Sequence, residues 1–142
     1  RIFREISIRL KSLSYQEQEF FIRSNYVDQS ILIWISICRT YKFIGDFSSM
    51  IISEKFNSYQ LKLDYDDFNY FYEQQKVLYE ELNSLKDSTR KKLRQVFFKI
   101  MKDLNIISKT KEITPLLPSK EIKEISINTT NDMQLFLPGF LV

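Results

Sequence analysis

The sequence predicts a mainly α-helical protein, and three observations lead to that fold class. Only 2 of the 142 residues are Gly and 3 are Pro, so few positions interrupt a regular helix. Apolar residues make up 44% of the chain, which is enough for a buried core. Many of them recur at spacings of three and four, as on one face of a helix. We therefore expect a compact multi-helix globule with at most one short β-hairpin.

We expect three parts along the chain, divided where the composition changes. Residues 1–57 should form an N-terminal helical subdomain and residues 58–118 a second subdomain. Residues 119–142 should form a C-terminal helix and tail packed on the body. The chain does not begin with Met, and Arg1 already belongs to an amphipathic pattern, so we expect the first subdomain to be truncated at its start.

The first subdomain begins with two predicted helices. Apolar residues at helical spacing predict one helix over residues 1–13. Ser14 and Glu17 then have the spacing of a capping box, in which the serine side chain accepts from a backbone N–H and the glutamate reaches back to the cap. The second helix should therefore run from there through about Arg23.

A central buried helix should follow these two. Asp28 is its N-cap candidate, and residues 31–43 behind it are apolar on nearly every side. We therefore expect Trp34 and Cys38 to be covered by neighbouring elements. The apolar pattern is interrupted at Gly45 and then resumes.

The second subdomain starts after Asn57, where the resumed pattern ends. Asp64 is expected to cap a helix, and Asp66 and Asp67 in its first turn suit the positive end of the helix dipole. The apolar face of this helix is expected to comprise Phe68, Phe71 and Tyr72.

The most regular apolar stripe in the chain follows a connection over residues 77–87. Ser88 is a suitable N-cap for it, and Asn105 is a suitable stop. Between them six apolar residues recur at helical spacing, and we expect all six to be buried. They are Leu93, Val96, Phe97, Ile100, Met101 and Leu104. This orientation would leave Phe98 on the solvent side.

A short hairpin, a helix and an apolar tail are expected after that stripe. Residues 106–107 and 112–114 would pair across a Ser-Lys-Thr-Lys turn, and Pro115 would end the hairpin. Ser119 should cap a helix through Ile125. The last residues are too apolar to extend into water, so they should dock on the body.

The residue inventory excludes several kinds of active site. With no His and one Cys, the chain cannot build the usual zinc sites or a nucleophile–base pair. The acidic residues from Asp64 onward do not form an EF-hand, because Asn69 and Gln75 stand where Gly and Glu are needed. We expect no catalytic residue, no metal and no cofactor, although a carboxylate-only metal site stays open. A single Cys fits a reducing cytoplasm, and the run 31–38 is too short to span a bilayer.

Charge is segregated in the second subdomain. Residues 86–102 carry a net charge of +6, and because the whole chain carries +3, the remainder carries −3. A helix face that serves only solubility usually mixes signs in i,i+4 pairs, and this one does not. We interpret it as a surface that binds an anion, while an ordinary solvated face is the alternative.

The order helix, connection, basic helix, hairpin is that of a winged helix-turn-helix, whose second helix enters the major groove. We therefore expect a winged helix-turn-helix-like C-terminal half that contacts DNA through the basic helix and the wing tip. The candidate contacts are Ser88, Thr89, Arg90, Lys91, Lys92, Arg94, Gln95, Lys99, Lys102, Lys109 and Lys111. Of these, Lys91, Lys99 and Lys102 should face away from the core. Base stacking by Tyr65, Tyr70, Tyr72 and Tyr79 is an alternative to their packing in the core.

Five stretches of the chain resemble the BrxA family, the small all-helical proteins of BREX phage-defence islands. They are ICRTYKFIGDF at 37–47, EKF at 54–56, DFNYFYEQQ at 67–75, DSTRKKLRQVFFKIM at 87–101 and ITPLLP at 113–118. The resemblance runs from about Arg1 to Pro118, and its most specific element is STRKKLRQVFFKIM with the ITPLLP that follows. Members of the family normally have a further helical segment ahead of the position of Arg1, and the tail after Ser126 has no match.

The resemblance implies a cytoplasmic, non-catalytic protein that binds double-stranded DNA through helix-turn-helix elements and positive surfaces. It also implies partners, namely other BREX proteins including a site-specific DNA methyltransferase. Related sequences have carried an inner-membrane label that the hydropathy of this chain does not support, so we expect no membrane contact. We also expect the protein to be a monomer in the absence of partners. Two alternatives stay open: an adaptor whose basic helix docks on an acidic protein, and RNA binding like that of the antitermination factor NusB.

Overall fold

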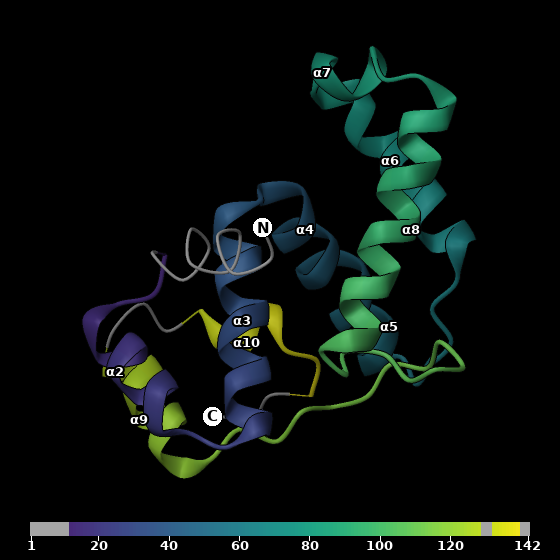
Figure 1. The fold of residues 1–142 in the computed structure, drawn as a ribbon. Coiled ribbons are helices and arrows are strands. Elements are labelled where there is room, and N and C mark those ends of the chain that lie inside the picture. The colour runs from purple at the N-terminus through teal and green to yellow at the C-terminus, as the bar shows by residue number, and fades with distance from the viewer. Residues whose placement is uncertain (1–11, 129–131, 140–142) are drawn as a thin grey trace.

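The computed structural model describes residues 12–128 and 132–139, and helices dominate this part of the chain (Figure 1). The elements in chain order are α2 (Tyr15–Arg23), α3 (Tyr26–Thr40), α4 (Lys42–Phe47), the π-helix η1 (Ser48–Ile52), α5 (Ser53–Asn57), α6 (Tyr65–Leu78), α7 (Glu80–Asn83), α8 (Asp87–Asp103), α9 (Lys120–Asn128) and α10 (Met133–Phe136). The mainly α fold class is therefore confirmed. The helix predicted over residues 1–13 lies almost wholly outside the described residues.

Helix α3 lies at the centre of the fold, as its apolar composition predicted. Trp34 and Cys38 are buried within it. The helix begins and ends earlier than predicted, because Phe43 belongs to α4. Its N-cap is Asn25, whose side chain accepts from the backbone N–H of Asp28 at 2.9 Å. The expectation that Asp28 is the cap was therefore wrong.

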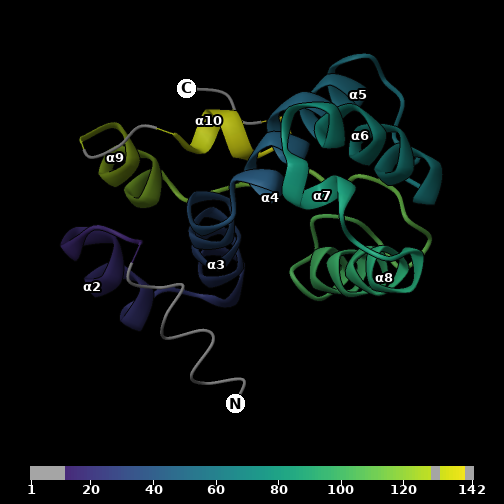
Figure 2. The same cartoon turned by 90° about the horizontal axis from the view of Figure 1, so that it is seen from above.

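The C-terminal segment is fastened to α3 near the start and at the middle of that helix, and also to η1. Figures 1 and 2 show α2 and α9 on one side of α3 and the group α6–α8 on the other. The indole N–H of Trp34 and the hydroxyl of Ser48 both donate to the carbonyl of Phe136, at 3.0 and 2.7 Å. Asp28, which does not cap α3, instead accepts from the backbone N–H of Ser119 at 3.1 Å.

Two helices begin with capping boxes: the box at Ser14 was predicted, and at Asp64 the sequence predicted a cap that proves to be a full box. At α2, the Ser14 side chain accepts from the N–H of Glu17, and the Glu17 side chain accepts from the N–H of Ser14. At α6, Asp64 and Asp67 form the same reciprocal pair. Each box satisfies backbone donors that the first turn of a helix leaves without partners.

The segment between α3 and α6 corrects the expected interruption. Gly45 lies inside α4, where an added Cβ would stand 2.7 Å from the carbonyl oxygen of Cys38. Glycine therefore allows α4 to approach α3 closely. The following residues form the π-helix Ser48–Ile52, which the sequence did not predict. The helical run then ends at Asn57, as predicted.

A buried ion cluster joins α2, α3 and the segment before α10. The guanidinium of Arg39 contacts Glu17 at 2.8 Å and Asp132 at 2.7 Å. The side chain of Glu17 is 0% exposed and that of Arg39 is 11% exposed. Burial lowers the pKa of Arg39, but hydrogen bonds to both carboxylates outweigh it, so the net pKa lies above its ordinary value.

The predicted hairpin is present as a tight turn with isolated bridges. Ile107 bridges Ile113, and Lys62 bridges Glu112. The backbone N–H of Ile113 donates to the carbonyl of Leu61 at 2.7 Å. The chain just before α6 therefore lies along the turn, and the sequence did not predict this third segment.

Ser119 caps α9, as the sequence predicted. Its hydroxyl accepts from the backbone N–H of Ile122 at 3.3 Å. The helix runs to Asn128, three residues beyond the predicted end at Ile125. Further on, the side chains of Met133 and Leu137 are buried, so the apolar segment around α10 is part of the core.

Candidate nucleic-acid interface

Helix α8 carries most of the predicted contact residues, and its start differs from the prediction. The helix begins at Asp87, and its N-cap residue Lys86 makes no side-chain capping bond. Ser88 is therefore not the N-cap but lies in the first turn. The helix stops, as predicted, before Asn105, which adopts the left-handed conformation with φ +61°.

The buried face of α8 is rotated from the predicted one. Phe97 and Met101 are buried as predicted, at 2% and 0% exposure. Phe98, expected on the solvent side, is also buried at 2%. Leu93 and Val96, expected in the core, are exposed at 37% and 44%. The other two members of the predicted stripe, Ile100 and Leu104, are half-buried.

Contacts with α6 account for this rotation. Arg94 donates to the side-chain oxygen of Asn69 at 3.1 Å, and Arg90 donates to Glu73 at 2.8 Å. The guanidinium of Arg94 also lies 4.2 Å from the ring centre of Tyr65. These pairs run in opposite directions along the two helices, so α6 and α8 lie alongside each other. The buried face of α8 thus includes two arginines.

The structure separates the eleven candidate contacts by exposure. The exposed ones are Ser88, Thr89, Lys91, Lys92, Gln95, Lys99 and Lys109. The half-buried ones are Arg90, Arg94, Lys102 and Lys111. One expectation is corrected by this, because Lys102 is half-buried and does not face fully away from the core. Arg90, a candidate contact, is paired with Glu73.

Five candidates gather in one open hollow on the surface of α8. The α8 hollow is lined by Tyr65, Ser88, Lys91, Lys92, Arg94 and Gln95. No carboxylate lines it. Within the part of the chain that the structure describes, neither Lys91 nor Lys92 forms an ion pair. The hollow is therefore positively charged and has no internal counter-charge.

The turn after α8 places one further candidate beside this hollow. The ammonium of Lys111 lies 4.3 Å from the ring centre of Tyr65. Lys109, at the tip of the same turn, is exposed. Among the described residues it forms no hydrogen bond with α8. The structure thus joins Lys111, but not Lys109, to the α8 hollow.

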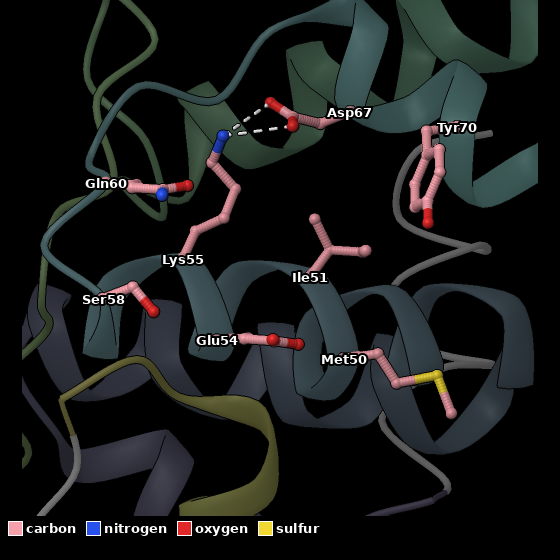
Figure 3. A pocket seen from close by; sticks show the side chains of 8 residues that line it. All are labelled: Met50, Ile51, Glu54, Lys55, Ser58, Gln60, Asp67 and Tyr70. Atoms are coloured by element: carbon pink, nitrogen blue, oxygen red, sulfur yellow. Dashed lines mark hydrogen bonds and ion pairs between the residues drawn. The ribbon is translucent and has the colours of Figure 1, made fainter.

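A second hollow, between η1, α5 and α6, differs in its charge (Figure 3). It is lined by Met50, Ile51, Glu54, Lys55, Ser58, Gln60, Asp67 and Tyr70. Figure 3 shows Lys55 reaching from α5 toward Asp67, and its ammonium donates to both carboxylate oxygens at 3.1 Å. Because this cation is already neutralised, the α8 hollow is the stronger candidate for binding an anion.

The described residues contain no cluster of metal ligands and no reactive thiol. No group of three or more His, Cys, Asp or Glu side chains in this part of the chain lies close enough to hold a metal ion. Burial raises the pKa of the Cys38 thiol well above its ordinary value, so the thiol stays protonated near neutral pH. None of the described helices is long and apolar enough to cross a membrane.

Sequence reasoning missed the part that α6 plays in arranging this surface. Tyr65, Asn69 and Glu73 recur every four residues on α6, and Arg90 and Arg94 have the same spacing on α8. Matching periods of this kind on successive helices were the available signal. Of the other tyrosines considered for base stacking, Tyr72 is buried, and Tyr70 and Tyr79 are exposed.

A known protein family matches the part of the chain that carries most of this surface. A family model described as BrxA matches residues 1–128 of the chain. The match therefore includes α6, α8, the turn that follows α8 and α9. No curated protein matches the chain.

Proposed function

We propose, from the premise that this chain belongs to the BrxA family and is thus a component of a BREX phage-defence system, that it binds double-stranded DNA and has no catalytic role. The α8 hollow and the exposed side of α8 around it form the proposed contact surface. The observation that carries the proposal is the grouping of Lys91, Lys92 and Arg94 in a hollow that no carboxylate lines.

Phosphate groups of the DNA backbone are the ligands that this surface fits. Lys91, Lys92 and Lys99 are exposed and long enough to reach phosphates on either side of a groove. Ser88 and Thr89, in the first turn of α8, offer hydroxyl groups beside backbone N–H groups that have no partner within a helix. The contacts are mostly to the backbone, so affinity should vary little with base sequence.

The arrangement around α8 supports a winged helix-turn-helix interpretation of residues 58–118. Helix α8 would be the groove helix, and the turn at 108–111 would be the wing. The segment 61–63 lies along that turn and fixes it to the body, since Leu63 donates to the carbonyl of Lys111 at 2.8 Å. A wing held in this way presents Lys111 next to the helix.

A pair of charge-matched variants tests the contact surface. Lys91→Ala/Lys92→Ala should weaken duplex binding on unrelated sequences and lower the salt slope by about two, because each phosphate contact contributes roughly 0.9. The control is Lys42→Ala/Lys120→Ala, which removes the same charge from exposed positions in α4 and α9. Mobility shifts at several salt concentrations measure both.

The control variant should bind duplex DNA almost as the wild type does. If both double variants lose the same affinity and slope, net charge alone would explain the binding, and α8 would not be the contact. A wild-type protein that binds structured RNA but not duplex DNA would favour the NusB-like alternative instead.

A second candidate function, that of a protein adaptor, rests on exposed apolar side chains at the end of α6. Val77 and Leu78 are 82% and 71% exposed, and they lie next to the acidic residues Glu80 and Glu81 of α7. Contiguous apolar patches on a surface mark sites that contact another protein, and these two side chains are adjacent and exposed. The proposed partner is another BREX protein, and the methyltransferase is one candidate.

The adaptor function predicts a separation of two activities. Val77→Ser/Leu78→Ser should abolish co-purification with a tagged partner from the same system and leave duplex binding unchanged. Co-purification that survives this change but is lost in Lys91→Ala/Lys92→Ala would instead place the partner on the basic side of α8.

A further inference from the structure

Tyr65 lies where α6, α8 and the turn after α8 meet. It is the first residue of α6, and the capping box of Asp64 fixes the backbone there. Its ring packs in a T-shaped arrangement against Phe98, with ring centres 4.9 Å apart. Because Phe98 is buried, this contact orients the tyrosine ring between α8 and the turn.

Two cations from different elements share this one ring. The guanidinium of Arg94 in α8 lies 4.2 Å from the ring centre, and the ammonium of Lys111 in the turn lies 4.3 Å from it. Attraction to the ring face offsets part of the repulsion between the two charges. Tyr65 therefore brings together two side chains that are 17 positions apart in the sequence.

Local hydrogen bonds restrain both residues, but neither cation has a counter-charge. The backbone of Lys111 has φ +65°, and its N–H donates to the carbonyl of Ser108 at 2.9 Å, so the turn has a defined geometry. Arg94 is positioned by Asn69, a neutral acceptor. Among the described residues neither Arg94 nor Lys111 forms an ion pair. Two uncompensated positive charges, each within 4.3 Å of the same ring centre, favour a bound anion.

We propose that Tyr65 is a positioning residue that holds Arg94 and Lys111 as a joint binding site for a phosphate diester of the DNA backbone. This inference rests on the proposed DNA binding and adds to it a defined link between the groove helix and the wing. Through the ring, α8 and the turn contact the same stretch of backbone. Tyr65 itself needs no contact with DNA.

Replacement of the ring tests the link. Tyr65→Leu keeps an apolar side chain against Phe98 but removes the aromatic face, so duplex binding should weaken roughly threefold to tenfold. The salt slope should fall by about one, because one phosphate contact is lost. Tyr65→Phe keeps the aromatic face and should bind within about twofold of the wild type. Denaturant unfolding establishes that each variant is folded.

A double-mutant cycle separates positioning from a general structural role. In the background Arg94→Gln/Lys111→Gln, the change Tyr65→Leu should have no further effect on affinity or salt slope, because there are no cations left to position. An equally large loss in that background would overturn the inference, as would equal binding by Tyr65→Leu and Tyr65→Phe. In both of these cases the wild type still binds duplex DNA. A wild type that does not bind duplex DNA would instead overturn the proposed function and this inference together.

Discussion

Phe98 and the apolar residues near it decide which side of α8 faces the solvent. Phe98 packs in a T-shaped arrangement against Tyr65 and is 2% exposed, whereas Leu93 and Val96 are 37% and 44% exposed. The side of α8 that carries Lys92 and Lys99 is therefore left free, and Lys102 is drawn partly toward the protein. The burial of Phe98 against α6 thus helps to determine which lysines can reach a ligand.

Truncation of these side chains should show the difference. Phe98→Ala should lower the free energy of unfolding by about 3–5 kcal/mol, because it leaves a cavity in the core. Leu93→Ala and Val96→Ala should each cost less than about 1 kcal/mol, since both side chains are already in contact with water. Urea unfolding of the three variants measures this, and equal losses would contradict the observed orientation of α8.

The buried thiol of Cys38 should make stability depend on alkaline pH. Burial, reinforced by the negative charge of Asp132, raises the pKa of this thiol well above its ordinary value of 9.0. The folded protein therefore holds the proton more tightly than the unfolded chain does. The stabilisation is fully present below the unfolded pKa and is lost as pH rises toward the folded one. Above about pH 9 the unfolding free energy of the wild type should fall more steeply than that of Cys38→Ala; parallel curves would contradict this.

Among the secondary-structure elements, the predictable features were those that depend on neighbouring residues. The capping boxes at Ser14 and Asp64 each need only two side chains three positions apart, so their sequence is enough to locate a helix start. Likewise Asn105 tolerates the left-handed conformation that ends α8. Such signals do not depend on the rest of the fold.

The orientation of α8 and the candidate site depend on tertiary contacts, and the sequence left them ambiguous. The helix has two overlapping apolar stripes, one through Leu93 and Val96 and one through Phe98. Charge did not distinguish them, because Arg90 and Arg94 cover aromatic rings on the buried side. Only the partner helix α6 selects between the stripes. The basic segment was therefore recognised from the sequence, but the α8 hollow was not.

The ion cluster between elements should contribute more to stability than an exposed ion pair does. Arg39→Ala would leave Glu17 buried without a counter-charge, which should lower the free energy of unfolding by about 3–5 kcal/mol. The control is Arg23→Ala, because the ion pair of Arg23 with Glu121 joins side chains that are 55% and 52% exposed. Solvent screens that pair, so its loss should change stability little. Comparable losses in both variants, measured by denaturant unfolding, would argue against the buried cluster.

For the molecule as a whole, one aromatic core crosses the predicted boundary between residues 57 and 58. Phe43 and Phe71 have ring centres 5.2 Å apart, and Phe47 and Phe97 have ring centres 5.0 Å apart. Trp34 also stacks on Phe97 at 6.2 Å. The core of the second subdomain is thus completed by α3 and α4. The division into three parts stays a prediction about sequence organisation.

A fragment of residues 58–118 should therefore fail to fold on its own. It would lose the rings of Trp34, Phe43 and Phe47 and expose the apolar face of α6 to water. Far-UV circular dichroism should show reduced helicity and no cooperative thermal transition, in contrast with the 142-residue chain. A sharp transition with native-like helicity in the fragment would show that the subdomain is autonomous.

The carbonyl of Phe136, which accepts from both Trp34 and Ser48, has a consequence for synthesis on the ribosome. Trp34 is translated 102 residues before this acceptor, and Arg39 is translated 93 residues before Asp132. Helix α3 therefore emerges with its apolar surface uncovered and with its buried polar groups still bonded to water. Nascent chains in this condition are prone to aggregation and are typical substrates of chaperones. Until translation has passed Phe136, the centre of the finished fold is the part of the nascent chain that needs protection.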